Sequence, residues 1–161
     1  MRLWPIHSET LVSALSKEEV LAQLNRVTGE EDYLDPRSRP VKPKLFNGIV
    51  GKNGFRISKV VRRADTFLPI IQGKIESTPR GSILFISYKL FPGSLSFLLF
   101  WSVMLAGFTI YYLLFAPNML YAFICLTLGV INHGLAMYFF DRQVKRSREV
   151  FFQLINFQMK D

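Results

Sequence analysis

The chain has 161 residues, 50% of them hydrophobic, and 20 Lys and Arg against 12 Asp and Glu give it a net charge of +8 at pH 7. Its one cysteine, Cys125, excludes a disulfide framework and a cysteine-based zinc site. With only His7 and His133 as histidines, the chain cannot assemble a histidine-based metal set or a Ser-His-Asp triad in a single domain. We therefore expect no cofactor, no metal site and no enzymatic activity.

The N-terminal part predicts a strand, a helix and a loop. Residues 10–15 alternate weakly between apolar and polar side chains, which is typical of a strand. Ser16 and Glu19 have the spacing of a capping box, so we expect a helix to begin there and to end at Gly29. Residues 30–44 contain three prolines and are expected to form a loop.

A period of two then predicts four strands, at residues 46–50, 55–61, 70–76 and 83–90. Asn53-Gly54 is a strong signal for a tight hairpin turn, and Thr-Pro-Arg-Gly at 78–81 predicts another. We expect these strands to form an antiparallel meander whose apolar face the N-terminal helix covers.

Residues 90–140 carry no charge, and Pro117-Asn118 interrupts them near the middle. Each half, 95–115 and 120–140, predicts a helix of about 30 Å, the thickness of the hydrocarbon core of a bilayer. The expected organisation is an α+β domain at 1–93, a transmembrane helical hairpin at 94–140 and a C-terminal helix at 141–161. The fold class is thus α+β: a small cytoplasmic antiparallel β-meander with an N-terminal helix, a transmembrane α-hairpin and a C-terminal amphipathic helix.

The orientation follows from the charges that flank this run. Lys89 precedes it, Arg142, Lys145, Arg146 and Arg148 follow it, and the turn at 116–118 is uncharged. By the positive-inside rule, both termini are expected to be cytoplasmic.

Several motifs resemble a family of small bacterial membrane proteins with two spans. They are FRIS at 55–58, FLPIIQGKI at 67–75, LSKEEV at 15–20 and Phe91-Pro92 before the first span. The family has an FLPxIxGxI-type β motif and no assigned function, and its members usually have Asn-Ser where this chain has Asp65-Thr66. The resemblance implies a location in the bacterial cytoplasmic (inner) membrane, and it implies no activity and no site.

Gly51-Lys52-Asn53-Gly54 is similar to the GXXG loop of KH domains, which clamps a nucleic-acid backbone. A KH domain needs helices on both sides of that loop, whereas here prolines precede it and an alternating strand pattern follows it. We therefore prefer a hairpin turn and do not expect a nucleic-acid partner.

Nine basic residues and no acidic residue lie between Pro36 and Ala64. Near an anionic membrane surface each contributes about 1 kcal/mol of attraction, although the same pattern is also typical of a solvated strand face. The candidate lipid- or partner-binding residues are those expected near the sheet: Arg56, Lys59, Arg62 and Arg63.

Asn132 and His133 are polar residues inside the second expected span, where such side chains are costly and need a partner. We expect an interhelical hydrogen bond to Ser102, to Thr109 or to a second subunit, with small residues allowing the close approach. The alternative is a proton-linked or ligand-binding site.

The function that these patterns favour is a non-enzymatic scaffold or assembly subunit of the membrane, which presents a basic cytoplasmic surface to anionic lipids or an acidic partner. The expected partners are membrane lipids, with a homo-oligomer or a membrane complex as the assembly. One alternative is a small-ligand or lipid-binding protein that holds an apolar ligand beneath the C-terminal helix. A less favoured alternative is a transporter or channel subunit with His133 on an oligomer axis.

Overall fold

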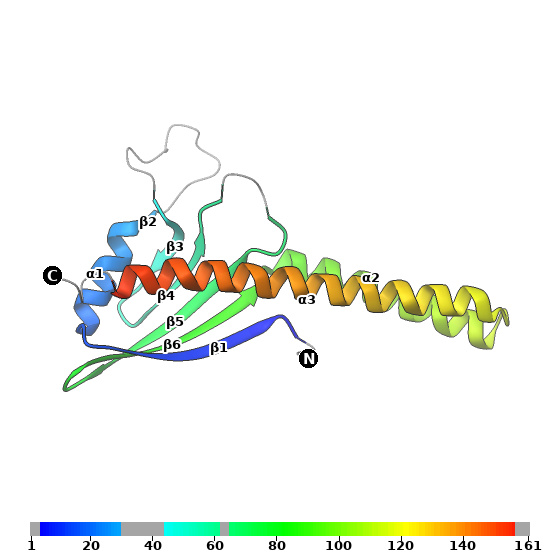
Figure 1. Cartoon of the computed structure of the whole chain (residues 1–161), viewed down its shortest axis with the longest axis horizontal. Helices are drawn as coiled ribbons and strands as arrows, with labels where there is room; N and C mark the ends of the chain where they lie inside the picture. The colour runs from blue at the N-terminus through cyan, green and yellow to red at the C-terminus, as the bar shows by residue number, and fades with distance from the viewer. Residues whose placement is uncertain (1–3, 30–43, 62–64, 157–161) are drawn as a thin grey trace.

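A computed structural model describes residues 4–29, 44–61 and 65–156 of the chain. Figure 1 shows a sheet with a helix at one end and a two-helix hairpin that projects from the other. The α+β class predicted from the sequence is confirmed.

The sheet has six strands in the order β1-β6-β5-β4-β3-β2. Their bounds are Ile6–Ser13 (β1), Thr28–Gly29 (β2), Phe46–Val50 (β3), Gly54–Lys59 (β4), Pro69–Thr78 (β5) and Gly81–Leu90 (β6). The predicted meander is confirmed as β3 to β6, which pair antiparallel in sequence order.

The sheet is larger than the predicted meander because two outer strands from before it join its edges. Strand β1 begins four residues earlier than predicted and pairs along its whole length with β6, from Ile6 opposite Lys89 to Ser13 opposite Ser82. Strand β2 pairs parallel with β3 through only two residues, and this parallel pair makes the sheet mixed. A strand of two residues is too short to show a period in the sequence.

Helix α1 (Lys17–Val27) begins as predicted. The Ser16 hydroxyl accepts from the Glu19 N–H at 3.3 Å, and the Glu19 carboxylate accepts from the Ser16 N–H at 2.7 Å. The helix stops next to Gly29, as predicted: Val27 is its last residue, and Thr28 is the C-cap. The backbone of Thr28 is extended and leads the chain directly into β2.

Helices α2 (Pro92–Leu114) and α3 (Met119–Asn156) follow the sheet. The sequence predicted a helix at 120–140 and a separate one from 141, but α3 is a single helix of 38 residues. At Asp141 the side chains of the helix change from apolar to charged. The backbone continues as one helix because no proline or glycine is present there to break it.

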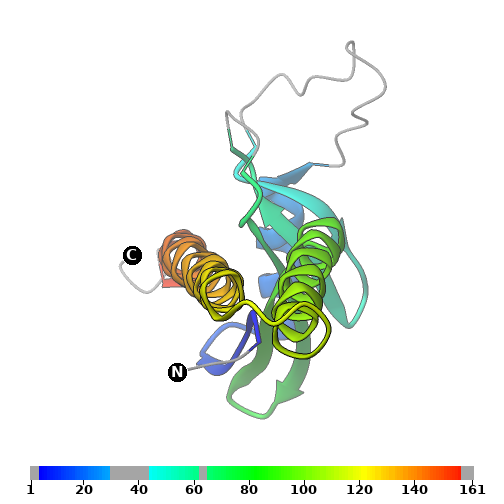
Figure 2. The ribbon, with the colours of Figure 1, turned by 90° about the vertical axis from the view of Figure 1, so that its right-hand side faces the viewer.

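We call α2 and residues 119–140 of α3 the apolar hairpin. Figures 1 and 2 show its two helices side by side, extending beyond the sheet. Both helices are long and apolar enough to cross a membrane, and only 6% of the apolar window of α2 and 11% of that of α3 is buried within the protein. Core helices of a soluble protein are mostly buried, so this exposure weakly supports a membrane location.

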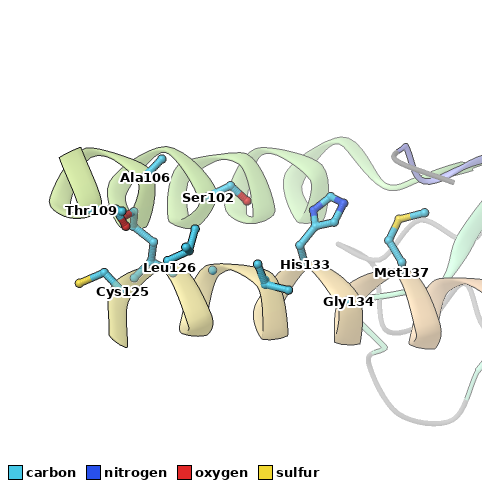
Figure 3. Close-up of a pocket in the computed structure, with 11 residues that line it drawn as sticks. Ser102, Ala106, Thr109, Cys125, Leu126, His133, Gly134 and Met137 are labelled. Atoms are coloured by element: carbon cyan, nitrogen blue, oxygen red, sulfur yellow. The ribbon is translucent and has the colours of Figure 1, made fainter. Parts of the chain in front are cut away.

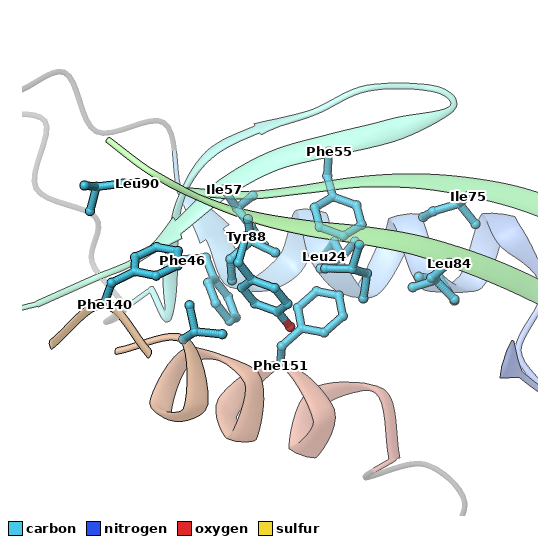
Figure 4. Close-up of a cluster of buried hydrophobic side chains, with 14 residues drawn as sticks. Leu24, Phe46, Phe55, Ile57, Ile75, Leu84, Tyr88, Leu90, Phe140 and Phe151 are labelled. Carbon is cyan, nitrogen blue, oxygen red and sulfur yellow. The ribbon is translucent and has the colours of Figure 1, made fainter. Parts of the chain in front are cut away.

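The second half of α3 crosses one face of the sheet, and α1 packs on the same face (Figure 1). Phe140, Val144 and Phe151 of α3 are buried there among side chains of the sheet and α1 (Figure 4). The Phe151 ring stacks on Phe55 at 5.5 Å and meets Phe46 edge to face at 6.4 Å. The apolar hairpin and the sheet domain therefore share one helix.

The glycine of the FLPIIQGKI motif has a packing role. Gly73 lies opposite Phe55 on the neighbouring strand. A Cβ atom at Gly73 would lie 2.2 Å from the Phe55 ring, so the ring occupies the space that any side chain would need.

Candidate functional site

The junction between α3 and the sheet contains a polar cluster of three side chains. The Tyr88 hydroxyl of β6 donates to the Glu9 carboxylate of β1 at 2.8 Å, and the Arg148 guanidinium of α3 lies 2.7 Å from the other Glu9 oxygen. Tyr88 is fully buried, whereas half of the Arg148 side chain remains exposed and lies over the Phe152 ring. The cluster links the edge strand β1 and its neighbour β6 to α3.

The electrostatics of this cluster suit a structural role. Burial, and then the hydrogen bond and charge of Glu9, raise the pKa of the Tyr88 hydroxyl well above its usual range. Tyr88 therefore stays protonated as the donor to Glu9. A fully buried, protonated tyrosine cannot reach a substrate or act as a base at neutral pH.

The part of the chain that the structure describes contains no group of three or more His, Cys, Asp or Glu side chains placed to hold a metal ion. The polar cluster fits this result, because its only oxyanion already accepts from Tyr88 and pairs with Arg148.

A second feature is a groove of about 430 Å³ between α2 and α3 in the apolar hairpin. His133 points across this groove towards α2 (Figure 3). Ser102 and Thr109 donate instead to the carbonyls of Leu98 and Leu105 on their own helix, both at 2.8 Å.

The predicted interhelical hydrogen bond to these two hydroxyls is thus absent from the described residues. Of the small residues expected to allow close approach, Gly129 faces Leu105 across the interface, whereas Gly107 and Gly134 border open space. The groove is lined almost wholly by apolar groups, with His133 as its most polar member.

The predicted basic residues do not form one patch in the described part of the chain. Arg56 is exposed on the sheet face opposite the helices, where Gln72 and Ile49 are its cross-strand neighbours. Lys59 lies three residues further along β4, so its side chain points to the other face, and it is half-buried. Arg62 and Arg63 lie outside the described residues.

A third feature, which we call the arginine hollow, is not predicted from the sequence. It has a volume of about 340 Å³ and lies where the turn before β5 meets α3, lined by Asp65, Phe67, Phe139, Arg142, Gln143 and Arg146. The signal for it was present in the sequence, because Arg142 and Arg146 are one helical turn apart directly after the uncharged run. The contribution of Asp65 and Phe67 depends on tertiary packing and has no local pattern.

Comparison with protein-family models, with curated proteins and with solved structures finds no match to this chain.

Proposed function

We propose that this protein is a non-enzymatic membrane scaffold: the apolar hairpin crosses the cytoplasmic membrane, both termini lie in the cytoplasm, and the sheet domain is held against the inner leaflet. The observation that carries this proposal is the continuity of α3. One helix supplies both an apolar segment with exposed side chains and the buried Phe140, Val144 and Phe151 of the sheet core.

A flexible linker would be enough to tether a domain to a membrane. A continuous helix does more, because it fixes the angle and height of the sheet relative to the bilayer. The Glu9–Arg148 ion pair and the Tyr88 hydrogen bond add a second attachment between α3 and the strands β1 and β6. Such rigidity favours a role in positioning a partner.

The surface for that partner is the sheet face that no described helix covers. We call it the open face, and we expect an acidic partner there because exposed basic and apolar side chains occur together on it. Its exposed members include Ile6, Val12, Ile49, Arg56, Phe85 and Lys89. Arg56 and Lys89 form no ion pair with another described residue, so both charges are available to an acidic surface.

The alternative of an apolar ligand beneath α3 needs a cavity at that place. Over the sheet the side chains fill the space, since Phe46, Tyr88 and Phe151 are fully buried in one core cluster. A hollow of about 430 Å³ remains at the edge of this core, between α1 and the end of α3, and its lining includes Val27 and Leu154. The filled core favours the scaffold, and the hollow at its edge is where the alternative would place an apolar ligand.

Self-association through the apolar hairpin is a second candidate, and the groove supports it. His133 faces the groove and has no hydrogen bond to another described residue, while Gly107 and Gly134 leave room for a close neighbour. A second copy could supply both the hydrogen-bond partner and the packing.

The test is native mass spectrometry of the full-length protein, extracted in mild detergent from its own membranes. We expect a stoichiometric acidic protein partner that is lost when Arg56→Glu and Lys89→Glu are combined. The matched control combines Lys17→Glu and Arg26→Glu, which reverse two charges on α1 on the other side of the sheet and should leave the partner bound. Recovery of the chain alone or as a homo-oligomer, with lipid but no partner, would contradict the scaffold proposal.

A further inference from the structure

We propose that the arginine hollow binds the phosphate of an anionic membrane lipid. The proposal rests on the function above, because it requires the apolar hairpin to lie in the membrane. The site differs from Arg56 and Lys59, the described members of the basic set that the sequence singled out, since neither of them lines the hollow.

The first argument is the pair of guanidinium groups. Arg142 and Arg146 are both exposed on one side of α3, and neither forms an ion pair with another described residue. Two like charges one turn apart destabilise a helix unless an anion lies between them. Guanidinium groups bind phosphate through two parallel hydrogen bonds, which makes paired arginines well suited to that ligand.

The second argument is that Asp65 is already occupied as a structural acceptor. One of its carboxylate oxygens accepts from the Phe67 N–H at 3.0 Å, and the other accepts from the Gln143 side chain. These bonds hold the turn at residues 65–68 against α3 and so build one wall of the hollow. Asp65 forms no ion pair with either arginine, which leaves both free for an external anion.

The third argument is the apolar floor. The Phe67 ring stacks on Phe139 at 5.6 Å, and Phe139 belongs to the last turn of the uncharged run. The hollow therefore has aromatic rings on the side of the apolar hairpin and arginines on the side of the sheet domain. This order matches a phospholipid, whose glycerol and acyl chains lie on the membrane side of its phosphate.

Position and size fit the same ligand. Arg142 is two residues past the end of the uncharged run, at the level where lipid headgroups meet water if the hairpin spans the bilayer. A hollow of about 340 Å³ exceeds the space of several waters at about 30 Å³ each, which is enough for a phosphate with a small alcohol.

The test measures lipid retention by the full-length protein in nanodiscs that contain equal amounts of phosphatidylglycerol and phosphatidylcholine. After release into the gas phase, native mass spectrometry counts the two lipids that remain bound. We expect the wild type to retain phosphatidylglycerol preferentially, and the preference to fall about tenfold when Arg142→Gln and Arg146→Gln are combined. The matched control, Arg80→Gln with Lys145→Gln, removes two exposed charges that do not line the hollow and should change the preference by less than about twofold.

A second pair keeps the charge but removes the guanidinium fork: Arg142→Lys with Arg146→Lys. We expect it to lose most of the preference as well. Equal retention by wild type and the Gln pair overturns the proposal, and if the Gln pair does not fold, full retention by the Lys pair overturns it.

A second experiment with inorganic phosphate distinguishes a lipid headgroup from a soluble phosphate. If millimolar inorganic phosphate binds the wild type in neutral lipid and not the Gln pair, the hollow is a site for a soluble phosphate, and the lipid assignment is wrong. Failure of the proposed function looks different: alkaline carbonate would then extract the wild type from its own membranes as a soluble protein.

Discussion

Replacing Phe151 tests the claim that α3 fixes the apolar hairpin to the sheet. Phe151 is fully buried, and its ring contacts Phe46 at 6.4 Å and Phe55 at 5.5 Å. Phe-to-Ala changes at such sites cost 3–5 kcal/mol because they remove apolar burial and leave a cavity. We expect Phe151→Ala to lower the free energy of opening of the α3–sheet interface by about 4 kcal/mol, or nearly three orders of magnitude in the opening equilibrium.

The assay is hydrogen exchange of the full-length protein in nanodiscs, read by mass spectrometry for peptides from α3 and from β5 and β6. The matched control is Phe152→Ala on the next residue of the same helix. Phe152 is half-buried, and the Arg148 guanidinium lies 4.9 Å from its ring centre, an interaction worth about 1 kcal/mol.

We expect Phe151→Ala to speed exchange in α3 and in the strands together, and Phe152→Ala to change it little. Equal exchange in the two variants would refute the claim that this ring anchors the helix. Faster exchange in α3 alone would show that the sheet does not depend on it.

Three further substitutions test other parts of the fold. Gly73→Ala should cost about 1–3 kcal/mol, because its Cβ would lie 2.2 Å from the Phe55 ring, and denaturation in urea would measure it. Tyr88→Phe should cost about 1 kcal/mol at neutral pH by removing the hydrogen bond to Glu9. Because the pKa of Tyr88 is raised in the folded state, the stability that its hydrogen bond contributes is present below about pH 10 and is lost as the pH rises further. The difference in unfolding free energy between wild type and Tyr88→Phe should therefore shrink in alkali. Ser16→Ala should cost about 1 kcal/mol by removing the helix cap.

Each of these substitutions has a control or a contrary outcome. Gly51→Ala places its Cβ 3.5 Å from the nearest atom and should be tolerated, so equal losses at Gly51 and Gly73 would count against the packing argument. A constant gap between wild type and Tyr88→Phe from pH 8 to about pH 11 would show that Tyr88 ionises normally. For Ser16→Ala, NMR titration should show the pKa of Glu19 still lowered, because the Ser16 backbone N–H, its largest cause, is retained and only the smaller effect of the hydroxyl is lost. A full return of the Glu19 pKa to its usual value would contradict this assignment.

The fold was predictable where the signal is local. Ser16 with Glu19 marked the start of α1, and Asn53-Gly54 marked the turn between β3 and β4. The two-residue strand β2 could not be predicted, because its pairing with β3 depends on chain geometry and not on a sequence period. The continuity of α3 could not be predicted, because a change of polarity such as the one at Asp141 is also typical of a boundary between two helices.

The candidate sites likewise include residues that have a local sequence signal and pairings that depend on the tertiary fold. Charge and composition identified Arg56 and His133, but not which face each side chain occupies. The arginine hollow joins Asp65 to Gln143 across 78 positions of sequence, and such a pairing has no local signature. The Tyr88–Glu9–Arg148 cluster likewise brings together three segments that are distant along the chain.

The most direct test of the scaffold account is the topology of the full-length chain in its own cells. In a Cys125→Ser background, a single cysteine is introduced by Asn118→Cys in the turn of the apolar hairpin or by Lys52→Cys at the tip of the β3–β4 turn. The account predicts that a membrane-impermeant maleimide labels Asn118→Cys in intact cells and labels Lys52→Cys only after permeabilisation. Labelling of both positions in the same state, or of Lys52→Cys in intact cells, would contradict it.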